Sequence, residues 1–600
     1  MMNSSGQLFR ALLISVGCLS FNEVTIAAEN WVKVTAPQFT LYSSAKSTDA
    51  LQVAEEFQQF IDALGEILTV DTRRLPPLTI VMFSHSKEFR AFRPRRPDGK
   101  PWDVAGFFSR QEGWAVFGLG GARLDQDVRR TVFHEGVHWY LSGSEYSCPA
   151  WLEEGLAEVF STFVMAKNHR EWGQPIPDHI ATLRSLQLMP LERLLSVSHT
   201  DPLFNEMQRT SLFYAESWAF AHFLLFGEHN GERKLYNEYV RLFRSGIHPD
   251  DAFRNAFKKD YLTMDRELSR YIEGGRYFVG GRAAAPLGKS LTVTLVGDAE
   301  REIALARLAL GANSLPLAQS HLDKAVGPDV NPVALNEVEG YAALMNKDEV
   351  EALRFFNKAA AAGSRDYRVY FELAQRKHQA AADGGDSITL SPAEARVVAD
   401  NYEKTIELCP WLLPPYQGLG GIIGLLGSDS EKDRSILRRG KELFPADGMI
   451  QLGLAASLHE SGRSDEANDA LSVILAAPDK YPTNVSRYAR SLERSWTFND
   501  HSERIRILVE KEQFSEALKE IDALLTKDVP QSSRAMLALN RATIWVRVQL
   551  LEAIRAGDEG RWSDARKSLE EIMTASVPNG TKYEAKMRLN EMDRRSLGRD

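Results

Sequence analysis

The chain contains the stretch Thr131-Val-Phe-His-Glu-Gly-Val-His-Trp-Tyr140, which holds the pattern His134-Glu135-x-x-His138. Positions four apart share one face of a helix, so two imidazoles placed in this way can bind one metal ion together. Glu135 is rotated around the helix, where its carboxylate can take a proton from a water molecule. The pattern predicts a zinc-dependent hydrolase, although a helix with two ordinary histidines gives the same match.

A second helical pattern follows in Pro149-Ala-Trp-Leu-Glu-Glu-Gly-Leu-Ala-Glu-Val-Phe160, in which Glu154 and Glu158 are again four residues apart. Proline suits the first turn of a helix, and the apolar residues of the stretch fall on one stripe. Two histidines leave a catalytic zinc site one protein ligand short. The connection over residues 142–148 is short, so the two helices must be neighbours and a carboxylate of the second can complete the site.

The segment Trp151-Leu-Glu-Glu-Gly-Leu-Ala157 resembles the WLNEGFA element of the gluzincin peptidases, the clan that contains thermolysin and the aminopeptidase N family. The resemblance implies that Glu154 is the third zinc ligand and that Glu158 orients a ligand histidine from outside. The interval between the two motifs is shorter than in aminopeptidase N. The metzincin pattern does not match, because it needs Gly and His where this chain has Leu141 and Ser144.

A third element is the apolar helical pattern over residues 213–225, which begins with Tyr214. In the aminopeptidase relatives a tyrosine at a similar interval stabilises the oxyanion, so the resemblance implies this role for Tyr214. This chain has Ser217 where those relatives have glycine, and a buried aromatic residue with a satisfied hydroxyl is the alternative. His222, a single histidine on an apolar face, is typical of a structural residue.

The broadest resemblance, over about residues 30 to 280, is to the bacterial peptidase MA-like gluzincins, which are often exported and often fused to helical repeats. It implies an α+β, thermolysin-like peptidase domain at 29–285 with Zn²⁺ as its cofactor. The GAMEN element of aminopeptidase N is not visible, so aminopeptidase activity is not implied. The segment 106–118 is typical of a β-hairpin, and either arm is a candidate for the edge strand that pairs with an extended substrate.

From about residue 298 the sequence shows amphipathic helical patterns that come in pairs. Ala318 with Ala325 recurs as Ala352 with Ala359, an offset of 34 that equals the length of a tetratricopeptide repeat. We therefore predict an all-α, tetratricopeptide-like solenoid at 298–600, with another array of α-hairpins as the alternative. The stretch before it is rich in Gly and Ala and predicts the domain boundary.

The first 28 residues have the character of a signal peptide, with an apolar run over residues 11–21 and small residues near Ala28. A packed or disordered N-terminal helix is the alternative, and Cys18 is a weaker candidate for lipidation because Ser15 stands where a bulky apolar residue is preferred. We therefore expect an exported protein, periplasmic or secreted, with a lipid-anchored form less favoured. No other run is apolar enough to span a membrane, so none is expected in the mature chain.

The net charge of −9 offers no basic surface for nucleic acid, and none is expected as a partner. Two hypotheses for function follow. In the first, His134, His138 and Glu154 bind zinc, Glu135 and Tyr214 act on a peptide or protein substrate as an endopeptidase would, and the repeats bind that substrate or a partner protein. In the second, the chain is an exported scaffold whose peptidase domain is idle or weakly active.

Overall fold

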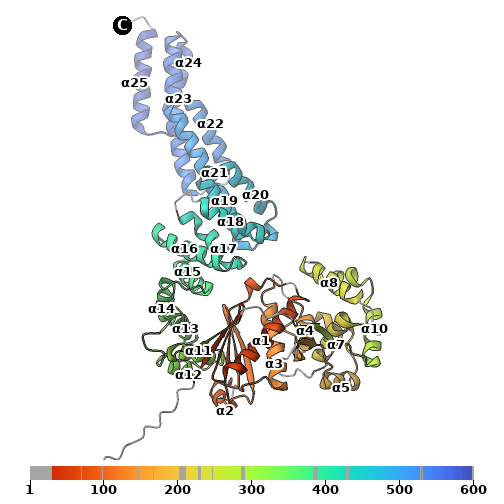
Figure 1. The fold of residues 1–600 in the computed structure, drawn as a ribbon. Helices are drawn as coiled ribbons and strands as arrows, with labels where there is room; N and C mark the ends of the chain where they lie inside the picture. The colour runs from red at the N-terminus through yellow and green to blue at the C-terminus, as the bar shows by residue number, and fades with distance from the viewer. Residues whose placement is uncertain are drawn as a thin grey trace, which may run out of the picture. The chain divides into compact units, whose positions relative to one another are not determined.

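The computed structural model describes residues 30–596, with short gaps at 69, 97–98, 145–147, 167, 202–210, 228–230, 246, 285–290, 383–388, 427–430, 528 and 530. The predicted signal peptide and Cys18 lie outside the described residues. The contacts divide the chain into two compact units, Met1–Val369 and Tyr370–Asp600, which are described separately (Figure 1). Cys148 and Cys409 are free thiols.

The first unit is built around a six-stranded mixed sheet with the order β4-β5-β3-β2-β1-β9. The strands are β1 (Val32–Thr35), β2 (Phe39–Ser43), β3 (Leu78–Met82), β4 (Gly106–Gln111), β5 (Trp114–Leu119) and β9 (Thr292–Leu295). The central strands β2, β3 and β5 run parallel, whereas β4 is an antiparallel edge strand and β9 pairs with β1. Every residue of β3 and β5 is buried, as is usual for strands covered on both faces. The predicted hairpin is confirmed, and β4 is its edge arm.

Helices α1 (Ser47–Gly65) and α3 (Gln126–Leu141) cover one face of the sheet (Figure 1). Phe57 of α1 packs edge-on against Phe39 and Phe117, which anchors the helix to the strands. Beyond α3 lie α4 (Ala150–Ser161) and α7 (Leu212–Phe226). Helix α7 is buried on all sides from Phe213 to Leu225, which explains why its sequence is apolar all round.

Shorter elements complete this part of the first unit. A three-stranded antiparallel sheet consists of β6 (Val164–Ala166), β7 (His169–Trp172) and β8 (Gly280–Ala283). Besides the short helix α2 (Ser86–Phe89), the described residues of this part form five more helices. They are α5 (Pro177–Ser185), α6 (Leu191–Ser196), α8 (Gly231–Arg244), α9 (Pro249–Phe257) and α10 (Tyr261–Gly274), whose packing completes the core. Their apolar side chains join those of α1, α3, α4 and α7 in one continuous core.

The first helices of the predicted repeat segment belong to the first unit, and α11 (Asp298–Gly311) covers the other face of the sheet. These helices are α11, α12 (Leu315–Leu322), α13 (Pro332–Met345) and α14 (Glu349–Ala361). A Cβ atom on Gly311 would lie 2.3 Å from Val116, so α11 lies directly on β5. Lys33 of β1 also forms a 2.7 Å ion pair with Glu300 of α11. The compact unit therefore continues to Val369, past the boundary near residue 290 that the composition predicts.

The second unit is an array of helices in which sequence neighbours pack together. After α15 (Tyr367–Ala382) it contains α16 (Pro392–Leu408), α17 (Leu413–Ile422), α18 (Glu431–Leu443), α19 (Gly448–Glu460), α20 (Ser464–Ala476), α21 (Thr483–Glu510), α22 (Phe514–Leu525), α23 (Gln531–Asp558), α24 (Trp562–Thr574) and α25 (Asn579–Ser596). A Cβ atom on Gly453 would lie 2.4 Å from Gly420, so glycines let α17 and α19 pack backbone to backbone. Within the described ranges, no helix combines the length and apolar character needed to cross a membrane.

Candidate metal centre

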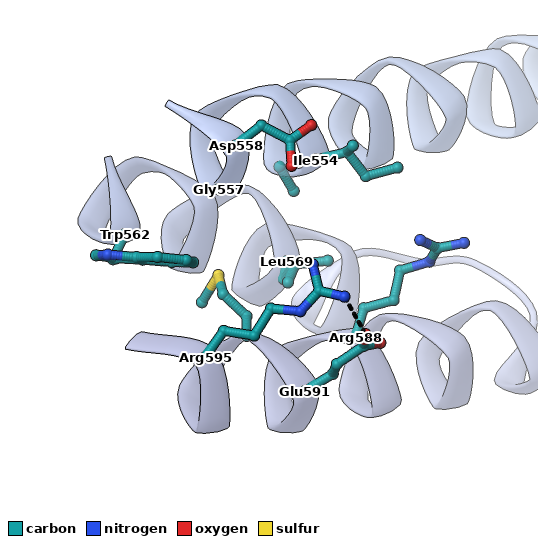
Figure 2. Close-up of a pocket in the computed structure, with 10 residues that line it drawn as sticks. Ile554, Gly557, Asp558, Trp562, Leu569, Arg588, Glu591 and Arg595 are labelled. Carbon is teal, nitrogen blue, oxygen red and sulfur yellow. Dashed lines mark hydrogen bonds and ion pairs between the residues drawn. The ribbon is translucent and has the colours of Figure 1, made fainter. Parts of the chain in front are cut away.

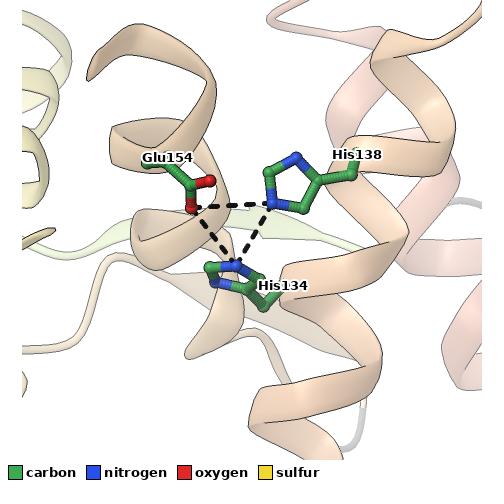
Figure 3. A group of neighbouring side chains, drawn as sticks. All are labelled: His134, His138 and Glu154. Atoms are coloured by element: carbon green, nitrogen blue, oxygen red, sulfur yellow. Dashed lines mark hydrogen bonds and ion pairs between the residues drawn. The ribbon is translucent and has the colours of Figure 1, made fainter. Parts of the chain in front are cut away.

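Two helices bring the candidate ligands together. Helix α3 begins after Asp125, whose carboxylate accepts a 2.9 Å hydrogen bond from the Val128 amide and caps the helix. The four-residue spacing of His134 and His138 then directs both rings toward α4 (Figure 3). Helix α4 is held in place by α7, because a Cβ atom on Gly155 would lie 2.4 Å from the Ser217 carbonyl oxygen. This close packing explains the glycine that follows Glu154.

Three donor atoms form a nearly equilateral triangle. The Nε2 atoms of His134 and His138 are 3.2 Å apart, and Glu154 Oε2 lies 3.4 Å and 3.6 Å from them (Figure 3). Zinc–ligand bonds of about 2.0–2.1 Å in tetrahedral geometry place ligand atoms roughly 3.3–3.4 Å apart. Glu154 Oε2 is buried, and its contacts are with the Nε2 atoms of the two histidines. The donor types and their spacing therefore fit one Zn²⁺ ion.

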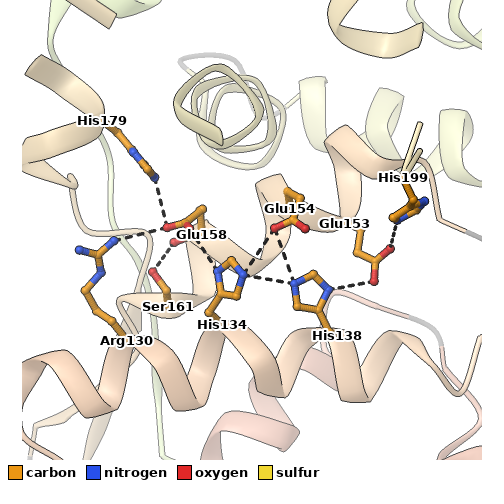
Figure 4. Close-up of polar contacts among 9 residues, drawn as sticks. All are labelled: Arg130, His134, His138, Glu153, Glu154, Glu158, Ser161, His179 and His199. Carbon is orange, nitrogen blue, oxygen red and sulfur yellow. Dashed lines mark hydrogen bonds and ion pairs between the residues drawn. The ribbon is translucent and has the colours of Figure 1, made fainter. Parts of the chain in front are cut away.

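A carboxylate lies behind each histidine. His134 Nδ1 is 3.2 Å from Glu158 Oε1, and His138 Nδ1 is 2.9 Å from Glu153 Oε1 (Figure 4). Such a contact holds the Nδ1 proton and leaves the Nε2 lone pair free to face a metal. The structure thus places Glu158 where the resemblance implies, and it adds Glu153.

Further residues support these carboxylates from distant parts of the sequence. His179 of α5 lies 3.2 Å from Glu158 Oε2, and Arg130 of α3 lies 3.5 Å from the same atom (Figure 4). His199, which precedes α7, contacts Glu153 Oε2 at 3.1 Å. The sequence analysis did not identify these residues. The sequence could have indicated Glu153, because it stands next to the predicted ligand Glu154. It could not have indicated His179 and His199, because they reach the site through tertiary packing.

Without a metal, the electrostatics of the cluster favour a protonated His138 beside an ionised Glu154. Burial opposes protonation of His138, but hydrogen bonds to Glu153 and Glu154, together with nearby negative charge, raise its pKa to about 10. Burial also disfavours the charged form of Glu154, yet its contacts with both histidines lower its pKa to about 2. The pKa of Glu158 is likewise held well below its usual value, against burial, by His134 and His179. Metal binding must therefore displace a proton from the His138 imidazole.

The two other candidate residues lie on the same helices. Glu135 is half-buried on α3, and its negative charge contributes to the raised pKa of His138. Tyr214 lies in the first turn of α7, where its buried ring packs edge-on against Phe213 at 5.4 Å. Its proposed role on the oxyanion stays a prediction.

His222 has the contacts of a structural histidine. Its Nε2 lies 2.9 Å from the Gly173 carbonyl oxygen, and its Nδ1 lies 2.6 Å from the Tyr271 hydroxyl. Burial, only partly offset by the Gly173 hydrogen bond, lowers its pKa to about 4, so the ring is neutral near pH 7. Its ring nitrogens are therefore engaged away from the three-atom cluster.

Comparison with known protein families and with curated protein sequences finds no match. The case for the site therefore rests on its own geometry. Within the described residues, His134, His138 and Glu154 form the one group of His, Cys, Asp or Glu side chains whose donor atoms could share a metal ion. The cluster is a candidate metal centre with two histidines and one carboxylate.

Proposed function

We propose that the chain is a gluzincin-type zinc peptidase whose helical repeats bind the substrate or a partner protein. The observation that carries the proposal is the donor triangle of His134, His138 and Glu154, which supplies three protein ligands. Structural zinc sites use four protein ligands, whereas catalytic sites use three and keep one position open. The His138 side chain is 18% exposed, while those of His134 and Glu154 are 3% exposed, so the cluster is accessible from one side.

The residues of the chain have separate roles in the proposed hydrolysis. A bound Zn²⁺ would polarise the scissile carbonyl as a Lewis acid. Glu135 takes a proton from the attacking water and then delivers it to the nitrogen of the leaving amine. Tyr214 donates a hydrogen bond to the oxyanion. Glu153 and Glu158 keep the two histidine rings oriented.

The edge of the sheet suggests how a substrate binds. Strand β4 has a free edge, whereas β5 is enclosed by β3 and β4. An extended peptide can pair with β4 through backbone hydrogen bonds, which give affinity with little sequence preference. Such binding accommodates internal segments of a polypeptide, in keeping with an endopeptidase. A signal peptide at 1–28 would place the enzyme in the periplasm or outside the cell.

The second candidate is an exported scaffold with an idle peptidase domain. The observation that favours it is the size of the helical array, which makes up the whole second unit. The retained Glu135 favours activity, because a scaffold has no need for a general base. The two candidates differ in whether bound metal supports turnover.

The test measures zinc content and cleavage of an unbiased peptide library on the same samples. We expect the purified chain to contain about one zinc ion and to lose cleavage after chelation, with recovery on adding Zn²⁺. Glu135→Gln should keep the metal and lose nearly all turnover, because an amide cannot accept the proton. Glu460→Gln, an exposed change on α19, is the control and should leave both unchanged. Bound zinc without cleavage by the wild-type chain would support the scaffold, and retained turnover in Glu135→Gln would refute the general base.

A further inference from the structure

Helix α23 has an exposed apolar face in addition to the face that it buries. Its buried side chains, which include Leu537 and Ala556, pack with α22 and α24. On another face, six mostly apolar residues recur at intervals of three and four. We call this set the α23 seam; it consists of Met536, Leu539, Thr543, Arg547, Leu550 and Ile554. Leu539 is 63% exposed, and Met536 and Ile554 are 50% and 43% exposed. A regular apolar stripe of this kind is typical of a helix that packs against another helix.

The seam borders a cavity rather than a flat surface. Five of its residues, from Leu539 to Ile554, line a space of about 570 Å³. The opposite walls are formed by Phe514 at the start of α22 and by the connection around Ser576–Pro578. A second space of about 220 Å³ between α23, α24 and α25 adjoins it, and Ile554 and Arg588 line both (Figure 2). The larger of the two volumes lies within the range of ligand sites, about 300–1,000 Å³.

One positive charge lies in the middle of the seam. The Arg547 guanidinium is 5.9 Å from the centre of the Phe514 ring and has no carboxylate partner among the described residues. Arg588, also on the wall of the cavity, already pairs with Glu584 at 3.2 Å. Glu512 also lines the cavity, and no ion pair between it and Arg547 is found in the described part of the chain. Arg547 is therefore available to a carboxylate from outside.

We propose that the α23 seam binds an amphipathic helix of a partner protein, with apolar side chains at intervals of three and four and a carboxylate opposite Arg547. The seam spans 19 residues, or about 27 Å of helix at 1.5 Å per step, which is long enough for such a helix. The proposal specifies the partner of the repeats in the proposed function. It does not depend on the metal chemistry.

A second copy of this chain is a poorer occupant. In a symmetric antiparallel pair the seam would be centred near residue 545, two residues from Arg547. The two arginines would then lie about 6 Å apart along the helix axis, and in a parallel pair they would face each other. Two like charges in an apolar interface are unfavourable, whereas a carboxylate is complementary. The charge therefore selects an acidic partner over self-association.

The test uses the full chain and a fluorescein-labelled helical peptide with leucines at the spacing of the seam and one central glutamate. Fluorescence anisotropy should show about tenfold tighter binding of this peptide than of its lysine counterpart. Arg547→Glu should reverse the preference. Leu539→Ser and Ile554→Ser, both at exposed positions, should each weaken binding about tenfold. Val473→Ser, at a position 51% exposed on α20, is the control and should bind normally.

Equal affinity for the two peptides, or no reversal by Arg547→Glu, would overturn the proposal. So would self-association in sedimentation experiments that Leu539→Ser abolishes, since that result assigns the seam to a second copy. Circular dichroism and zinc content are measured on every variant. If the folded, zinc-containing wild-type chain binds neither peptide, the seam proposal is refuted while the peptidase proposal stays intact.

Discussion

The carboxylates behind the two histidines are not equivalent. Glu158 is 1% exposed and contacts His179 and Arg130 as well as His134. The Glu153 side chain is 19% exposed, and its other partner is His199, whose side chain is 47% exposed. A buried carboxylate in a network is held more rigidly than one that borders solvent. We therefore expect Glu158 to contribute more to metal affinity than Glu153.

Alanine substitutions should rank the three glutamates of α4 by their position. Glu154→Ala removes a ligand and should weaken zinc binding most. Glu158→Ala and Glu153→Ala should each weaken it by roughly 10- to 100-fold, with Glu158→Ala nearer the upper value. Competition with a chromogenic chelator measures the dissociation constants. Glu192→Ala, at an exposed position on α6, serves as the control.

This ranking revises an expectation from helix geometry alone. Neighbouring helix positions are about 100° apart, which predicts that Glu153 faces away from the metal and contributes nothing. The structure instead places its carboxylate at the outer nitrogen of His138. If Glu153→Ala lowers the affinity more than Glu154→Ala does, Glu154 is not the ligand and the assignment of donors fails.

The β4–β5 hairpin is clamped at its tip by the first turn of α15. Arg368 Nη1 donates a 2.7 Å hydrogen bond to the Glu112 carbonyl oxygen. Gly113 has φ of 88°, and a Cβ atom there would lie 3.1 Å from Arg368 Cβ, so the turn needs glycine for its conformation and for space. The edge strand proposed to bind substrate is thus held by residues from the beginning of α15.

The clamp is part of a buried polar network. The Arg368 guanidinium lies 5.5 Å from the centre of the Tyr341 ring, and the Tyr341 hydroxyl donates to Asp366. Asp366 also accepts a 2.9 Å hydrogen bond from the Arg368 amide. Burial raises the pKa of Asp366 despite these contacts. Loss of the arginine side chain would remove the hydrogen bond to the hairpin tip and one of the positive charges beside Asp366.

Arg368→Ala should lower the free energy of unfolding of the first unit by about 1–3 kcal/mol. It should also speed hydrogen exchange of the β4 amides, because the hairpin tip loses its anchor. Thermal denaturation and exchange measured by mass spectrometry test both effects, and zinc content should not change. Arg354→Ala, which removes an exposed ion pair and a ring contact on α14, is the matched control. Unchanged exchange in β4 would show that the clamp does not hold the strand.

At the scale of the whole molecule, the sheet has helices on both faces. Ala115, Phe117 and Leu119 of β5 belong to the core shared with α1 and α3. On the opposite face, Cβ atoms on Gly118 and Gly311 would lie 2.9 Å from Leu308 and 2.3 Å from Val116. Removal of α11 would therefore expose the apolar face of the sheet to water.

Two truncations should behave differently. A fragment of residues 30–382, which keeps α11 to α15, should fold, bind zinc and cleave short peptides. A fragment of residues 30–297 should be insoluble or poor in metal, because it lacks the helices that cover β3 and β5. Solubility, circular dichroism and zinc content compare them. If the shorter fragment folds and binds zinc as well as the longer one, the domain boundary lies in the Gly-rich stretch before residue 298, as the sequence predicts.

Local patterns in the sequence determined many elements of this protein. The spacing of His134 and His138 predicted a shared helical face, and the short connection to α4 predicted that a carboxylate of that helix lies beside them. Both inferences depend only on helix geometry and loop length, which act over a few residues. The same is true of the β4–β5 hairpin and of the buried helix α7.

Tertiary packing decided what no local pattern records. The contacts of His179 and His199, the choice of β4 as the free edge, and the inclusion of α11 to α14 in the first unit all join residues far apart in the chain. The repeat spacing of Ala318 and Ala352 indicated helix pairs, but it could not indicate that the first pairs bury an apolar sheet. Which surface a helix covers depends on the apolar area that other segments leave exposed, and only the folded chain defines that area.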